Sequence, residues 1–159
     1  MANAAQNLSS GMYLLTTREA DQDYGCLINS AMEVSRNPGR IAVCLVKRNL
    51  THEVLTRTGI FNLCAITEDA PFDLFHRFGM TSSRKSDKFA GFPHLERTAN
   101  GLACLNRYAN MYLSARVTEA VDLGDHTLFI GEMTDEAVLS GQNTCTYHHF
   151  MNCICRKAK

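Results

Sequence analysis

The chain has 159 residues, of which 45% are apolar and 20% are charged, and its 16 basic residues balance its 16 acidic residues. This composition is that of an ordinary globular domain, and it excludes a disordered chain, a collagen-like chain and a protein that attracts nucleic acid through excess positive charge. No apolar run approaches the length of a membrane span and the N-terminus lacks the pattern of a signal peptide, so we expect a cytoplasmic protein without membrane contacts.

The first part of the chain predicts two paired strands and a third, buried one. Residues 11–18 predict a strand, residues 21–25 a turn, and residues 26–35 a second strand that ends before the breaker at Pro38. We therefore expect a hairpin. Residues 41–47 are apolar at six of seven positions and rich in Ile and Val, which indicates a central strand buried on both faces.

The middle of the chain predicts two short helices separated by a strand. Residues 51–58 predict a helix with Thr51 as its N-cap and Gly59 as its C-terminal stop. Residues 60–67 predict a strand. Residues 69–79, in which phenylalanine recurs at every third position, predict the second helix.

The second half of the chain predicts a long loop followed by a hairpin. Residues 81–100 are polar and irregular, which is typical of a loop. Residues 110–123 and 126–140 alternate between apolar and polar side chains and predict two antiparallel strands joined by a tight turn at Gly124 and Asp125. About six strands and two short helices predict a mainly β, antiparallel barrel with helical crossovers. We expect one domain over residues 11–150, with an N-terminal tail at residues 1–10 and a C-terminal tail at residues 151–159.

Cysteines, histidines and carboxylates do not form a catalytic or metal-binding pattern. The seven cysteines are odd in number, and Cys44 and Cys64 lie in apolar runs, which favours free thiols in a reducing compartment. Cys153 and Cys155 lack a second pair of ligands. We therefore expect no metal site and assign no catalytic acid, base or nucleophile. The glycine motifs that bind dinucleotides and phosphates are absent from the sequence.

A cationic segment at the start of the predicted helix is the first candidate ligand site. Lys47, Arg48, Asn49, Thr51 and His52 gather where free backbone N–H groups and the helix dipole attract an anion. This combination suits a phosphate. A capped helix with solvated cations is the simpler explanation of this segment when it is taken alone.

A second cationic segment lies in the predicted loop. Ser82, Ser83, Arg84 and Lys88 supply hydroxyl groups and cations, and arginine grips phosphate with two parallel N–H groups. The alternative is a mobile, soluble surface loop. Two separate segments of this kind in a neutral chain indicate one anionic ligand between them.

Two further features have both a functional and a structural interpretation. Asn29 and Ser30 lie within the predicted strand 26–35, where an amide is poorly suited to a ladder, so either a ligand or a bulge or edge position accounts for them. Asp125 and His126 lie at the tip of the second hairpin, where a turn residue and a surface imidazole are the simpler interpretations.

Together these segments resemble the flavin reductase-like family, whose fold is the FMN-binding split barrel. The resemblance rests on GMYLLTT, NSAMEVSRNP, IAVCLVKRNLTHEVL, FGMTSSRKSDKF and GDHTLFIGE in this order, and it runs from about Gly11 to Tyr147. Within the family, the chain is similar to flavoredoxin and to the flavin module that some proteins fuse to a rubredoxin. The implied fold is an antiparallel split barrel of Greek-key type over residues 11–150.

The resemblance implies a cofactor, an assembly and a set of contacts. It implies noncovalent FMN, in preference to FAD, in a homodimer whose second subunit helps to cover the flavin ring. The implied contacts are Asn29, Ser30 and Ala31 at the ring edge, Lys47, Asn49, Thr51, His52, Ser82, Ser83, Arg84 and Lys88 at the ribityl chain and phosphate, Phe89 near the ring, and His126 on the nicotinamide side.

Three functions are open at this point. The one we favour is an oxidoreductase that passes electrons from NAD(P)H through flavin to a downstream acceptor. The alternatives are an FMN-binding, flavoredoxin-like electron carrier without significant nicotinamide oxidation, and a binding module without flavin. The sequence contains no rubredoxin segment, so we expect the acceptor to be a separate electron-transfer protein, free flavin or another small molecule.

Overall fold

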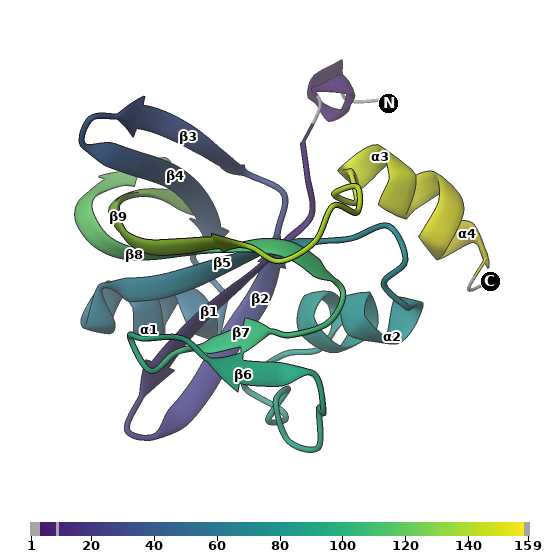
Figure 1. The fold of residues 1–159 in the computed structure, drawn as a ribbon. Helices are drawn as coiled ribbons and strands as arrows, with labels where there is room; N and C mark the ends of the chain where they lie inside the picture. Colours follow the sequence, from purple (N-terminus) through teal and green to yellow (C-terminus); the bar gives the residue numbers. More distant parts are fainter. Residues whose placement is uncertain (1–3, 9, 158–159) are drawn as a thin grey trace.

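The structure of the chain, a computed structural model, describes residues 4–8 and 10–157 (Figure 1). Nine strands and several short helical segments occur within these residues. The strands are β1 (Tyr13–Glu19), β2 (Gln22–Ile28), β3 (Ala31–Arg36), β4 (Gly39–Val46), β5 (Ile60–Ile66), β6 (Leu95–Arg97), β7 (Ala103–Leu105), β8 (Ala109–Asp122) and β9 (His126–Val138). The helical segments are η1 (Ala4–Asn7), α1 (Leu50–Thr58), α2 (Phe72–Phe75), η2 (His76–Met80), α3 (Tyr147–His149), η3 (Phe150–Ile154) and α4 (Cys155–Lys157).

Seven of the strands form one antiparallel sheet in the order β2-β1-β5-β8-β9-β4-β3. Its two edge strands, β2 and β3, follow each other in the chain and are joined by Asn29 and Ser30. The sheet therefore curls until its edges come close, and the seam of the barrel lies beside these two residues. The Cys44 N–H donates to the Ser30 carbonyl (3.0 Å), which extends the pairing of β3 with β4 to the end of the Asn-Ser connection. The predicted mainly antiparallel β architecture with short helical crossovers is confirmed.

Two apolar cores lie on opposite faces of the central strands β1 and β5. Leu15 and Leu63 point into the barrel, whereas their neighbours Leu14 and Cys64 point outwards, because successive side chains of a strand alternate. The outer core is covered by α2, η2 and the C-terminal helical segments (Figure 1). Burial of both faces was predicted for residues 41–47, and there it is partial, because Ala42 on the outward face is buried whereas Cys44 is partly exposed.

The first predicted hairpin is confirmed, although its strands have other limits. The turn lies at Ala20 and Asp21, whose φ angles are 49° and 63°. β2 already begins at Gln22, inside the predicted turn 21–25. The predicted strand 26–35 is two strands, and the break between them falls on the Asn-Ser pair. The pair therefore lies in the connection between two edge strands and not in the interior of a ladder.

Two regions predicted to be irregular contain regular structure. Residues 81–100 include β6, which pairs with β7 in a small second sheet. The C-terminal tail is helical as far as residue 157, and Ile154 and Cys155 pack against the outer core. Among the described residues, no helix is long and apolar enough to cross a membrane. The remaining positions of the two predicted tails, 1–3, 9 and 158–159, lie outside the described residues.

Candidate functional site

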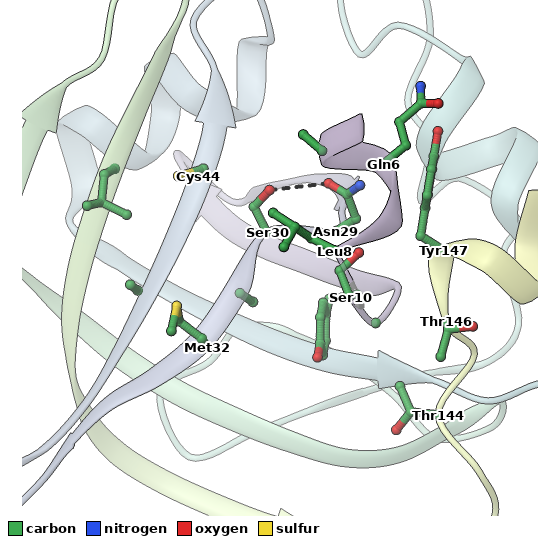
Figure 2. Close-up of a pocket in the computed structure, with 16 residues that line it drawn as sticks. Gln6, Leu8, Ser10, Asn29, Ser30, Met32, Cys44, Thr144, Thr146 and Tyr147 are labelled. Atoms are coloured by element: carbon green, nitrogen blue, oxygen red, sulfur yellow. Dashed lines mark hydrogen bonds between the residues drawn. The ribbon is translucent and has the colours of Figure 1, made fainter. Parts of the chain in front are cut away.

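A cavity of about 740 Å³ lies at the seam of the barrel, and we call it the large cavity (Figure 2). Its floor includes Ala42 and Cys44, which belong to the outward face of β4. Asn29 and Ser30 stand between the edge strands, and their side chains hydrogen-bond to each other (3.3 Å). The predicted amide and hydroxyl therefore face a cavity. Ala31, the third residue predicted here, also lines it.

The opposite wall of the large cavity comes from the two ends of the described chain. Gln6 and Leu8 precede β1, and Thr146 and Tyr147 stand at the start of α3 (Figure 2). Sequence analysis identified none of these residues. One signal was available, because the Thr146 hydroxyl caps α3 by accepting from the His149 N–H (3.0 Å), but a cap indicates a helix start and not a cavity wall.

A second cavity, of about 380 Å³, joins the two cationic segments, and we call it the basic cavity. Arg48 and Asn49 line it from the chain that follows β4. Ser82, Arg84 and Lys88 line it from the loop that follows η2. The structure thus brings together two segments more than thirty positions apart in the sequence, as a single anionic ligand between them requires.

A third cavity, of about 230 Å³, lies between the other two. It shares Asn29 and Tyr147 with the large cavity. It shares Leu27, Gly79 and Met80 with the basic cavity. The three cavities therefore adjoin one another, and we call them together the groove, with an amide and apolar surfaces at one end and cations at the other.

Lys88 is a buried cation in this groove, with 5% of its surface exposed. Its ammonium donates to the carbonyls of Gly25 (3.1 Å) and Phe78 (3.0 Å). It forms no ion pair with any residue of the described chain. Burial lowers the pKa of Lys88 below its ordinary value. An ammonium has three N–H groups, so one remains for a further acceptor, and an anion would offset the cost of burying the charge.

Arg84 is already paired at the edge of the basic cavity. Its guanidinium forms an ion pair with Glu53 of α1, and both side chains are about half exposed. The same nitrogen lies 3.5 Å from the Arg48 carbonyl. Ser82 accepts a hydrogen bond from the Arg84 backbone N–H (3.2 Å), which shapes the loop. Ser83, predicted with them, does not line the basic cavity.

The start of α1 differs from the prediction. Asn49 is the N-cap in place of Thr51, because its side-chain oxygen accepts from the Thr51 N–H (3.4 Å). Thr51 is buried, with its hydroxyl beside the Cys26 thiol. Lys47 points to the second hairpin, where it pairs with Asp122 (2.6 Å). Of the three predicted residues, only Asn49 lines the basic cavity.

Two other predicted contact residues anchor structural elements. His52 Nε2 lies 2.7 Å from the Thr127 hydroxyl, and burial together with Lys47 lowers the pKa of His52, so that its imidazole is neutral at pH 7. Phe89 is buried in the outer core, where its ring lies 5.1 Å from that of Phe78. Neither side chain lines the groove.

His126 lies at the tip of the second hairpin, as predicted. Its Nδ1 is 2.8 Å from the Asp125 carboxylate, and this contact lowers the pKa of Asp125. Side chains two positions apart in a strand point to the same side, so His126 shares a face of β9 with Leu128, which lines the large cavity. His126 is therefore on the groove side of the sheet without lining the groove.

The cysteines are free thiols at all seven positions. Cys26 lines the basic cavity, and burial raises its pKa to about 11, so it is protonated at neutral pH. Within residues 4–8 and 10–157, no group of three or more His, Cys, Asp and Glu side chains is placed to hold a metal ion.

A family comparison identifies the chain. The family described as flavin reductase like domain matches residues 5–152. The chain belongs to this family. High molecular weight rubredoxin of Moorella thermoacetica is 34% identical over 147 residues, which cover 92% of this chain and 64% of that protein. The chain therefore spans less than two thirds of that relative.

A second relative covers both proteins more fully. The ferric-chelate reductase (NAD(P)H) of Archaeoglobus fulgidus is 31% identical over 150 residues, which cover 93% of this chain and 88% of that protein. The structure of an FMN-binding protein from Thermus thermophilus has the same fold, with a TM-score of 0.79 at 20% identity over 89% of this chain and 77% of that one. The chain is thus a member of the flavin reductase-like family with the split-barrel fold, as the sequence predicted.

The burial of Lys88 predicts a pH-dependent stability of the flavin-free protein. Because the pKa of Lys88 is lowered, the unfolded chain binds more protons than the folded chain in the pH window just below 10.5, and stability from this residue rises with pH there. In Lys88→Met this rise is lost. Urea unfolding across that window should show the wild-type protein gaining stability relative to Lys88→Met. Lys85→Met, which removes an exposed lysine from the same loop, should follow the wild type, and parallel curves for Lys88→Met would contradict the prediction.

Proposed function

We propose that the protein binds FMN in the groove and transfers electrons from NAD(P)H through the flavin to a separate acceptor. The single observation that carries this proposal is the groove, which runs from an amide and a hydroxyl at one end to a buried, unpaired ammonium at the other. FMN has the same order of chemistry, with a flat ring that has hydrogen-bonding edges, a polar chain and a phosphate dianion.

The basic cavity is where the phosphate would be held. Lys88 would donate its third N–H, and the negative charge would offset the cost of burying the ammonium. Arg48 forms no ion pair with a described residue, so its guanidinium is available. Arg84, Asn49 and Ser82 complete the donors at this end. The likeness to the FMN-binding protein of Thermus thermophilus favours FMN over FAD.

The large cavity is where the ring would lie. Asn29 and Ser30 would hydrogen-bond to its polar edge, and Tyr147 would form an aromatic wall. The floor at Ala42 and Cys44 has small side chains, which allow a flat ring to approach the sheet closely. FMN binding by the Thermus thermophilus protein with this fold supports the assignment.

The chain's own residues position the flavin and exclude water from one of its faces. When bound, FMN would supply hydride and electron transfer between a nicotinamide and an acceptor, and this chemistry needs no protein nucleophile. We therefore assign no catalytic acid or base. His126, on the groove side of β9, would lie near the nicotinamide. The names of the two relatives, a ferric-chelate reductase (NAD(P)H) and a high molecular weight rubredoxin, support an external acceptor that takes electrons from the flavin.

A homodimer is part of the proposal. Met32 and Val34 of the edge strand β3 are 65% and 46% exposed, and Met32 lines the large cavity. Apolar side chains at an unpaired edge beside an open cavity favour cover by a second copy. Sedimentation velocity should give about twice the chain mass of 17.7 kDa. A monomer that binds FMN with its ring fully shielded from iodide quenching would contradict this assembly.

Rapid mixing with a nicotinamide tests the electron-transfer proposal. Anaerobic addition of NADH or NADPH to the FMN-loaded protein should bleach the flavin absorbance at a rate that supports turnover. A purified protein that is colourless and does not quench the fluorescence of added FMN would refute flavin binding. Tight FMN binding with bleaching too slow for turnover would favour the flavoredoxin-like carrier over the reductase.

Substitutions in the basic cavity test where the phosphate is held. Arg84→Ala and Lys88→Met should each raise the dissociation constant of FMN by a factor that corresponds to about 1.5–3 kcal/mol, the usual worth of a hydrogen bond to a charged group. Riboflavin lacks the phosphate, so its affinity should not change. Arg57→Ala removes an arginine from the far end of α1 and is the matched control. Equal losses of affinity for FMN and riboflavin would contradict a phosphate site in the basic cavity.

A further inference from the structure

We propose that Glu53 limits the affinity of the site for flavin phosphate by holding Arg84, so that the flavin exchanges with solution during use. This inference rests on the proposed binding of FMN in the groove. It assigns a role to a residue that supplies no donor to the ligand. Glu53 is therefore a positioning residue, and it acts through Arg84.

The geometry sets a carboxylate in competition with the ligand. Glu53 belongs to the first turn of α1 and accepts a charge-assisted hydrogen bond from the Arg84 guanidinium. Arg84 lines the basic cavity, whereas Glu53 does not. The guanidinium is thus drawn towards α1 by a negative charge that stands beside the cavity. A phosphate that recruits Arg84 must take it from Glu53 or share it.

The charge balance of the cavity points in the same direction. Lys88, Arg48 and Arg84 supply three cations, and Glu53 neutralises one of them within the described chain. Lys88 is buried and donates to two carbonyls. Arg84 is the cation of the cavity that can exchange one partner for another, since it is paired with Glu53 and 48% of its side chain is exposed. The affinity for a dianion therefore depends on whether Arg84 is released.

Weak retention has a functional consequence. A flavin that is held by every available cation dissociates slowly and serves as a resident cofactor. A flavin whose phosphate competes with Glu53 for Arg84 leaves sooner, because the pair re-forms as the ligand departs. The Glu53–Arg84 pair thus determines how long the flavin stays bound. The protein is then intermediate between a flavoprotein with a fixed cofactor and a reductase that releases its flavin.

A purely structural role for Glu53 makes a different prediction. An acidic residue in the first turn stabilises a helix through its dipole. Glu53→Gln would then lower stability and leave the preference for FMN over riboflavin unchanged. The ratio of the two affinities therefore separates the proposed role from the structural one, because only FMN carries the phosphate.

The test is a titration of the full-length protein with FMN and with riboflavin, followed by fluorescence quenching. Glu53→Gln should tighten FMN binding by roughly 3- to 10-fold and slow its dissociation, with riboflavin affinity unchanged. The gain should shrink at about 1 M salt, since the pair is half exposed. Glu19→Gln is the matched control, because it removes the carboxylate of another arginine pair of α1, that with Arg57, outside the groove.

A second variant defines the mechanism. In an Arg84→Ala background, Glu53→Gln should have little further effect, because the competition needs the guanidinium. An undiminished gain in that background, or an equal gain for riboflavin or for Glu19→Gln, would overturn the proposal. FMN binding of unchanged strength in Glu53→Gln would overturn it and leave the proposed function intact. A wild-type protein that binds no FMN would overturn both.

Discussion

The ammonium of Lys88 is the interaction on which the candidate site depends. It joins three separate segments, because it lies in the loop after η2 and donates to a carbonyl of β2 and to one of η2. Gly25 permits this approach, since a Cβ there would lie 2.9 Å from the Phe89 ring and 3.0 Å from the Leu15 carbonyl. A larger residue would displace Phe89 and, with it, its neighbour Lys88. The cation end of the groove is therefore built by packing before any ligand is present.

One strand organises both the core and the groove. Ile41, Val43 and Leu45 of β4 face the interior of the barrel, and the intervening Ala42 and Cys44 line the large cavity. The same outward face continues towards the basic cavity, because alternate residues of a strand lie on one side. A shift of register by one residue would expose the core side chains and fill the groove. The fold and the site thus depend on the same pairing of β4 with β9.

The sequence predicted the elements more closely than the directions of individual side chains. Local patterns were sufficient for the antiparallel strands, for Gly59 as the end of α1, whose φ is 70°, and for the two cationic segments of the groove. They did not reveal that Lys47 pairs with Asp122 or that His52 contacts Thr127, because these partners are 75 positions away. The signal available for the wall at Tyr147, the Thr146 cap, indicates a helix start only, since a cavity between chain ends is a property of the assembled fold.

The cations of the groove differ in burial and in partners, and this difference gives them separate effects on a bound anion. A buried ammonium with fixed carbonyl partners gives a permanent preference for an anion, and it orients a ligand that is charged at one end only. An exposed guanidinium that is paired with a carboxylate can leave or re-form that pair at low cost, because water hydrates both partners when they separate. Its contribution to the binding of an anion can therefore change. Orientation and retention are therefore controlled by different residues. Under the proposed binding of FMN, a change in retention through Arg84 or Glu53 would not disturb the alignment of the flavin ring, because the ring would lie at the other end of the groove.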